Sequence, residues 1–149
     1  MRKLLLAIVF GMGGAELANA CECMERPPVS VCVGRSDAVF SGMVLVVRDS
    51  LQLDEDGRGG TPFRVAWIHV EKAWKGVRAD TIVTVRTGSG GGDCGFDQFA
   101  AGHRYVVFAH GTGLGTSRCD RTAGVRAPWG LIDALGSPIS RAKATERER

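Results

Sequence analysis

The feature that most constrains this chain is residues 18–23, ANACEC, where an export signal meets two cysteines. The small residues Ala18 and Ala20 stand at the two positions that a signal peptidase reads, so we expect cleavage after Ala20. The cut would make Cys21 the first residue of the exported chain, with Cys23 two positions on. Alternate residues of an extended segment point to opposite sides, so each cysteine needs its own distant partner.

Residues 1–20 have the parts of a secretory signal peptide. Arg2 and Lys3 form a positive n-region, and Leu4–Phe10 form a short apolar h-region. This run is too short to cross a bilayer core of about 30 Å, and no later stretch is long and apolar enough. We therefore expect an extracytoplasmic protein, either periplasmic or secreted, that is soluble or tethered only by its end.

Charge and length limit the classes of protein that remain. Loss of Arg2, Lys3 and Glu16 with the leader lowers the formal net charge from +3 to about +2, too little to indicate nucleic acid or a membrane surface as partner. The rest suits one domain, expected at residues 21–136, followed by a charged flexible tail at 137–149. The 21 glycines and the scarcity of helix-forming runs favour a β-rich fold.

Alternating and β-branched apolar runs predict five strands, the first of them buried on much of both faces. The expected strands are Asp37–Val47, Phe63–Trp74, Thr81–Arg86, Tyr105–Ala109 and Thr116–Val125. Short helices are expected before them at Val29–Gly34 and after them at Pro128–Leu135. This order predicts an all-β fold with flanking helices, specifically a five-stranded Greek-key barrel of the OB type.

Two polar segments between the strands are interpreted as loops. Asp49–Thr61 is expected to be a long hairpin loop, whose acidic run 54–56 is solvated, because it lacks the terminal Glu and flanking helices of an EF-hand. The run 88–92, GSGGG, lacks the Lys-Ser/Thr ending of a phosphate-binding P-loop.

Five cysteines in a small exported chain indicate disulfides rather than zinc. Cys94 and Cys119 are the candidates for distant partners of Cys21 and Cys23. Two such bridges would each close a loop of more than about 70 residues, worth roughly 4 kcal/mol in the chain-entropy model. Cys32 is then left unpaired, either buried on its helix or free to pair with another chain.

A zinc site is the rival interpretation of the N-terminal cysteines. It would combine them with His69, His103 or His110. The spacing matches no zinc-finger pattern, and an export signal argues against it. The three histidines are therefore expected to be ordinary strand and loop residues.

The whole pattern resembles a known family. A mature Cys-x-Cys, two prolines at 27 and 28, a third cysteine on a short helix, a late Cys94-Gly-Phe and a last cysteine before Pro-Trp are similar to the N-terminal domain of the tissue inhibitors of metalloproteinases. More broadly they resemble the netrin-like module, which shares the OB-fold. The resemblance spans about residues 21–135. It implies bridges Cys21–Cys94 and Cys23–Cys119, and leaves Cys32 without the sixth cysteine with which that position pairs in the family.

The function implied by the resemblance is protease inhibition without catalysis. The free amine and carbonyl oxygen of Cys21 would chelate the catalytic zinc of a metalloprotease, which is the expected protein partner, and the inhibitor carries no metal or cofactor of its own. The implied contact ridge is Cys21, Glu22, Cys23, Met24, Gly92 and Asp93. The animal inhibitors have a small uncharged residue at the second position, so Glu22 departs from the family pattern, and Asp93 adds a second negative charge.

Two other functions remain open beside inhibition. The chain could be a non-inhibitory netrin-like module that binds another protein or surface, since fold does not fix function. It could also be a lipoprotein with a diacylglyceryl group on the Cys21 thiol, although Ala18 stands where a lipobox normally has Leu and Leu17 is one place early. We expect no enzyme, because nucleophile elbows, Cys/His signatures and metal-ligand spacings are missing. The expected state is a monomer that contacts no nucleic acid, and no membrane unless Cys21 is lipidated.

Overall fold

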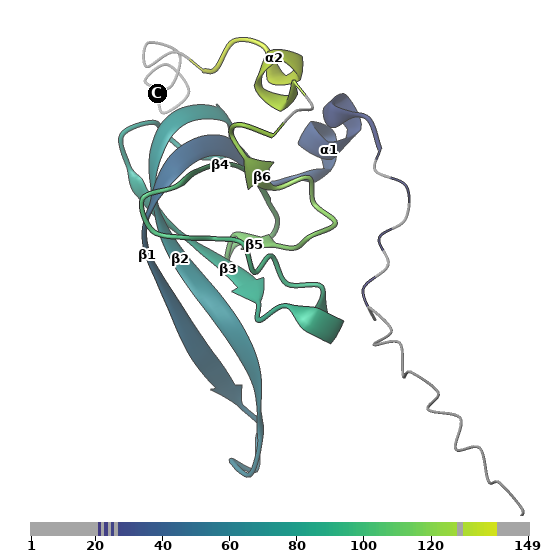
Figure 1. The fold of residues 1–149 in the computed structure, drawn as a ribbon, viewed down its shortest axis with the longest axis vertical. Coiled ribbons are helices and arrows are strands. Elements are labelled where there is room, and N and C mark those ends of the chain that lie inside the picture. The colour runs from purple at the N-terminus through teal and green to yellow at the C-terminus, as the bar shows by residue number, and fades with distance from the viewer. Residues whose placement is uncertain (1–20, 22, 24, 26, 128–129, 140–149) are drawn as a thin grey trace, which may run out of the picture.

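The structure is a computed structural model that describes residues 21, 23, 25, 27–127 and 130–139. The described part of the chain is mostly β with short helices (Figure 1). Its elements, in chain order, are α1 (Val29–Arg35), β1 (Ala38–Leu53), β2 (Gly60–Lys75), β3 (Ile82–Gly88), the 3-10 helix η1 (Gly91–Asp93), β4 (Arg104–Ala109), β5 (Gly115–Thr116), β6 (Ala123–Gly124) and α2 (Leu131–Leu135). The expected signal peptide and residues 140–149 of the expected tail lie outside the described residues.

The strands form one six-stranded sheet in the order β5-β3-β2-β1-β4-β6. Strands β1 and β2 make a long antiparallel hairpin that extends far beyond the rest of the sheet (Figure 1). The expected loop over Asp49–Thr61 is mostly wrong, because pairing continues to Leu53 and Gly60. Polar residues are tolerated there because the distal hairpin is exposed, and only the turn between the two strands is a loop.

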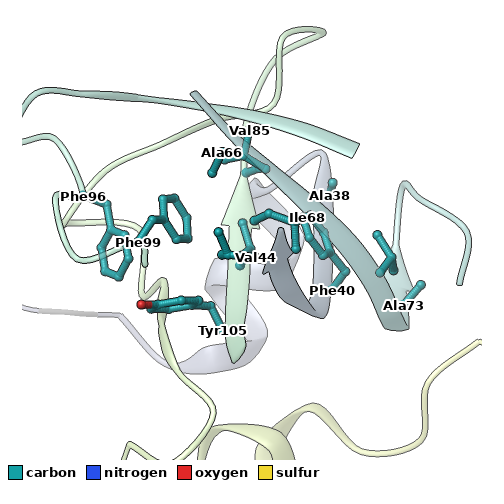
Figure 2. Packing of buried hydrophobic residues seen from close by; sticks show 13 residues of the cluster. Ala38, Phe40, Val44, Ala66, Ile68, Ala73, Val85, Phe96, Phe99 and Tyr105 are labelled. Carbon is teal, nitrogen blue, oxygen red and sulfur yellow. The ribbon is translucent and has the colours of Figure 1, made fainter. Parts of the chain in front are cut away.

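Two apolar clusters pack on opposite faces of β1 and β4, because alternate side chains of a strand point to opposite faces. The first lies on the inner side of the curved sheet and is shown in Figure 2; it includes Phe40, Val44, Ala66, Ile68, Val85, Phe96, Phe99 and Tyr105. The second lies between the sheet and the helices and includes Cys32, Val39, Val106, Phe108, Ala123 and Leu131. The prediction that the first strand is buried on both faces is confirmed for its first half.

The expected fifth strand at Thr116–Val125 is wrong. Only two short pieces, β5 and β6, pair with the sheet, and they join opposite edges of it. The reason lies in the buried hydroxyls of Thr116 and Thr122, which hydrogen-bond each other at 2.7 Å, while Thr116 also donates to the Phe108 carbonyl oxygen at 2.8 Å. A turn between these threonines replaces a continuous ladder.

Both helices are short and lie at one end of the sheet (Figure 1). Lys75 donates to the carbonyl oxygens of Val33 and Gly34 at 3.0 and 3.1 Å, which places a cation at the C-terminal end of α1. The Trp74 indole donates to the Gly136 carbonyl oxygen at 2.9 Å, just after α2. Pro128 and Trp129, expected to open the second helix, lie outside the described residues. In the described part of the chain, neither helix has the length and apolar character needed to cross a bilayer.

Candidate functional site

Two disulfides hold the N-terminal segment against the sheet. Cys21 is bonded to Cys94, with their Cα atoms 5.2 Å apart, and Cys23 is bonded to Cys119 at 5.4 Å. These are the pairs that the family resemblance implies. Cys32 is unpaired and buried on α1. Among the other residues of the expected ridge, Gly92 and Asp93 are described, whereas Glu22 and Met24 lie outside the described residues.

The two bridges lie side by side. The sulfur atoms of Cys21, Cys23 and Cys119 are all within 4.8 Å of one another. Every one of these sulfurs is already in a disulfide, so none is available as a thiolate, the form that binds metal. Over the described residues, no histidine joins a cluster with metal-ligand spacing. The described side chains therefore give no support to a zinc site built from the N-terminal cysteines.

Strand β3 ends in a tight loop that positions Cys94. A Cβ on Gly95 would lie 2.2 Å from the carbonyl carbon of Gly88, so the two glycine backbones cross at a distance that no side chain permits. Cys94 itself has φ of 55°, in the left-handed region that few residues adopt. The Phe96 amide then donates to the buried Thr87 hydroxyl at 2.6 Å and returns the chain to the core. The bridge to Cys21 thus starts from a constrained backbone.

Asp93 holds this loop closed. Its carboxylate accepts hydrogen bonds from the amides of Ser89 at 2.7 Å, Gly90 at 3.0 Å and Gly95 at 2.9 Å, and from the Ser89 hydroxyl at 3.1 Å. The Gly95 bond first, and then the Ser89 and Gly90 bonds, lower the pKa of Asp93, against an opposing effect of burial. The family resemblance implies that Asp93 lies on the contact ridge, where it adds a second negative charge. In the structure the Asp93 carboxylate also accepts the hydrogen bonds that hold its own loop together.

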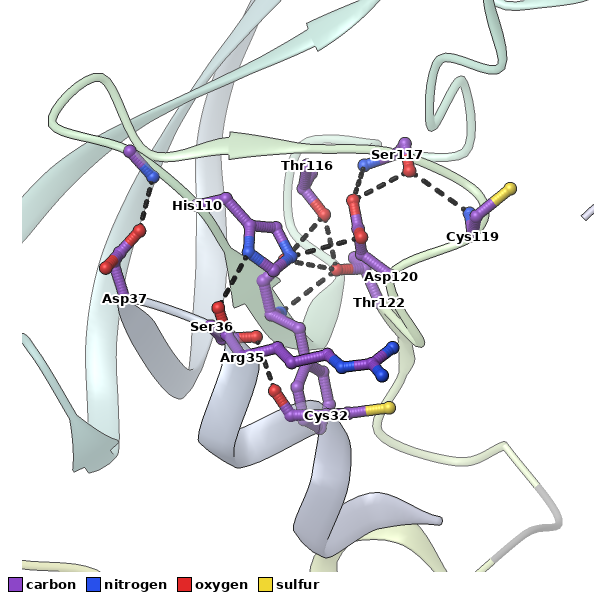
Figure 3. A network of polar contacts seen from close by, with 12 residues as sticks. Cys32, Arg35, Ser36, Asp37, His110, Thr116, Ser117, Cys119, Asp120 and Thr122 are labelled. Carbon is purple, nitrogen blue, oxygen red and sulfur yellow. Dashed lines mark hydrogen bonds and ion pairs between the residues drawn. The ribbon is translucent and has the colours of Figure 1, made fainter. Parts of the chain in front are cut away.

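The second anchor, Cys119, lies in a turn closed by Asp120 (Figure 3). Asp120 accepts from the Ser117 amide at 2.8 Å and the Ser117 hydroxyl at 2.7 Å, and the Cys119 amide donates to that hydroxyl oxygen at 3.2 Å. The other Asp120 oxygen lies 3.1 Å from Nε2 of His110. Nδ1 of His110 is 3.3 Å from the Arg35 carbonyl oxygen, so the imidazole links the Cys119 turn to the end of α1.

Sequence reasoning missed this role of His110 and Asp120. The available signal was the short Ser117-to-Asp120 spacing, which is typical of a turn closed by its own side chains. The contact with His110 leaves no comparable pattern, because the two residues meet only through the fold.

Hydrogen bonds also hold Pro27, which lies between the second bridge and α1. Arg121 donates through Nε to the Pro27 carbonyl oxygen at 2.8 Å, and the Cys32 thiol lies 3.6 Å from the same oxygen. Cys21 and Cys23 remain half-buried, between exposed surface and the loops that hold them. The described residues of the site, Cys21 and Cys23, are therefore anchored by two bridges and flanked by the loop of Asp93.

The sequence matches no known protein-family model and no curated protein. The two disulfides are typical of proteins from an oxidising compartment outside the cytoplasm.

Proposed function

We propose that the exported chain is a metalloprotease inhibitor of the kind that the tissue inhibitors of metalloproteinases represent. In this proposal the sheet is a small barrel of the OB type. The support for closure is that His110, at the end of β4, and Gly115, at the start of β5, exchange two backbone hydrogen bonds of 2.8 Å each. Strand β5 also pairs with β3, so hydrogen bonds link the two sides of the sheet at this point.

The observation that carries the proposal is the Cys21–Cys94 bridge. It fixes the residue that signal cleavage would expose against a loop whose own backbone is constrained by Asp93 and by the Gly88–Gly95 crossing. An inhibitor that binds through a main-chain amine and carbonyl needs these two groups in one fixed orientation, because a free terminus would lose much of its binding energy in becoming ordered.

The chemistry follows from the terminal amine. An α-amine titrates near about 7.7–8.0, so a substantial neutral fraction exists near neutral pH and can ligate a metal. A catalytic zinc keeps one coordination position for water, and the amine of Cys21 would displace that water from the target protease. The Cys21 sulfur takes no part in ligation, because it is held in the bridge to Cys94.

The same bridge argues against lipidation at Cys21. A diacylglyceryl thioether would use the sulfur that is bonded to Cys94. Lipoprotein maturation also usually acylates the amine, which would remove the proposed ligand. Intact mass and N-terminal sequencing of the exported protein separate the two states, since the proposal requires an unmodified Cys21 and a lipid adduct would overturn it.

Specificity in this proposal depends on Glu22. Its carboxylate would enter the pocket that receives the substrate side chain after the scissile bond, and burying it without a basic partner is costly. We therefore expect the target protease to have a basic residue in that pocket.

The test is inhibition of a panel of zinc proteases, with basic and apolar pockets represented, by the mature protein. The proposal predicts inhibition of members with a basic pocket, and a Glu22→Thr variant should shift inhibition toward members with an apolar pocket. Failure of both proteins to inhibit any member would refute the proposal.

A further inference from the structure

One side of the β1–β2–β3 sheet remains unused by the proposed function, and we call it the outer face. The register places its side chains in cross-strand rows: Val46 beside Trp67 and Thr84, and Arg48 beside Val65 and Arg86. The adjoining rows add Phe63 and Ile82. None of these residues belongs to the N-terminal ridge, so the inference goes beyond the proposed inhibition.

The opposite side of the same strands is the covered one. Val44, Ala66 and Val85 point into the inner cluster and are almost completely buried. On the outer face, by contrast, Val46 is 42% exposed and Ile82 is 60% exposed. Both helices lie at the other end of the molecule from the β1–β2 turn (Figure 1). Within the described residues, the outer face thus keeps large apolar side chains exposed to solvent, which is typical of interaction surfaces when they gather in one patch.

The two arginines of this face are preorganised on aromatic rings. The Arg86 guanidinium lies 3.7 Å from the centroid of Phe63 and donates to the Gln52 side-chain oxygen. The Arg48 guanidinium lies 5.8 Å from the centroid of Trp67. Such stacking restricts the rotamers of a long side chain and lowers the ordering cost of a later contact.

The same two arginines lack a carboxylate partner among the described residues. Elsewhere on the sheet, arginines are paired: Arg64 lies 2.7 Å from Asp49, and Arg104 lies 2.9 Å from Glu71. The outer face therefore joins exposed apolar groups to two arginines that form no ion pair with a described carboxylate. Aromatic residues and arginine are the types most enriched at protein interfaces and their hot spots.

We propose that the outer face docks a protein partner that presents carboxylates around an apolar side chain. The carboxylates would meet Arg48 and Arg86, and the apolar side chain would lie over Val65, which separates them in their row. Charge complementarity of this kind sets the choice of partner and the rate of association. A single-stranded nucleic acid fits less well, because the Arg86 guanidinium, 3.7 Å from the Phe63 centroid, already occupies a ring face on which a base would stack.

The test uses the mature full-length chain, immobilised through its C-terminus, as bait for a random-peptide display library. The prediction is enrichment of peptides in which Asp or Glu flank an aromatic or aliphatic residue. Their affinity should fall by about tenfold or more with Arg48→Glu/Arg86→Glu, since each exposed contact of opposite charge becomes a repulsion. The matched control is Arg58→Glu/Arg126→Glu, which makes the same charge change at exposed positions off this face and should retain binding.

Several outcomes would overturn the proposal. They are enrichment of basic or uncharged peptides, no enrichment, or equal loss of binding in both double variants. Binding of an oligothymidylate of about 16 nucleotides that depends on Arg48 and Arg86 would show a nucleic acid site instead. A dimer that dissociates in Arg48→Glu/Arg86→Glu would show that a second copy occupies the face, and peptide binding that requires removal of residues 140–149 would show that the chain's own tail does.

An Arg48→Lys/Arg86→Lys variant keeps the result interpretable if charge reversal disturbs folding. It retains both charges, so it should keep the preference for acidic peptides, and loss of that preference in a folded protein would also contradict the proposal. Protease inhibition by the N-terminal ridge should be equal in all these variants, so failure of the docking proposal and failure of the inhibitor proposal give different results.

Discussion

Removing the Cys23–Cys119 bridge tests how the two disulfides share the stabilisation of the fold. The bridges span 73 and 96 residues, but they are not independent loops. With Cys21–Cys94 intact, Cys23 and Cys119 are still connected by a short path through that bridge. The path runs two residues from Cys23 back to Cys21, crosses the disulfide to Cys94, and continues 25 residues to Cys119. The loop lost on removal is therefore about 27 residues, for which the chain-entropy model gives about 3.5 kcal/mol.

Removal of the Cys21–Cys94 bridge instead opens a loop of the same length, because the path through the remaining bridge is the same. Cys23→Ser/Cys119→Ser and Cys21→Ser/Cys94→Ser should therefore lose nearly equal unfolding free energies of about 3.5 kcal/mol each. For a domain of this length that corresponds to a fall in melting temperature of roughly 10–15 °C. Loss of both bridges should cost about 8 kcal/mol, more than twice either single loss, because the second removal then opens the full loop of 73 residues.

The assay is urea denaturation of the oxidised mature proteins, with tryptophan fluorescence as the measure of unfolding. The coupled-loop reasoning would be refuted by a loss below about 1 kcal/mol for either variant, or by a difference of more than about 1.5 kcal/mol between them. Equal slopes with denaturant concentration are required for the comparison, since a changed slope indicates a changed denatured state.

Three further predictions concern the loop of Asp93 and two glycines. Asp93→Asn should make stability less dependent on pH in acid. The pKa of Asp93 is held below its usual value near 3.8, so the ionised carboxylate stabilises the fold above that pH, and this stabilisation is lost as the pH falls through the lowered pKa. Acid unfolding that is unchanged in the variant, followed by circular dichroism, would contradict this prediction. Gly42→Ala should destabilise by about 1–3 kcal/mol, since its Cβ would lie 2.3 Å from the His69 carbonyl oxygen. Gly34→Ala on α1 has open space and should stabilise by about 0.5–1 kcal/mol in the same urea titration.

Four strands could be predicted from the sequence because their signal is local. The β-branched run that begins at Ala38 and the alternation from Phe63 follow directly from burial on one or both faces. The distal hairpin could not be predicted in this way. Residues such as Asp49 and Arg64 are polar on both strands, yet they face each other in register and form an ion pair. Their strand conformation depends on the partner strand, which no local pattern reveals.

The candidate site was predictable only in part, and for a similar reason. The disulfide pairs came from the family resemblance, because cysteine spacing alone allows more than one pairing. Asp93 and Asp120 were polar residues near a cysteine in the sequence, but their roles depend on where several backbone amides converge. The contact between His110 and Asp120 joins two elements that meet only after the chain has folded.

The most direct test of the central claim changes only the position of the terminal amine. Mature protein that begins at Cys21 and a form with one extra N-terminal alanine should have the same two disulfides and the same stability, because Cys21 keeps its bridge to Cys94. If the amine and carbonyl of Cys21 ligate the protease zinc, the extended form should lose inhibition of every protease that the mature form inhibits. Equal inhibition by the two forms would contradict chelation by Cys21.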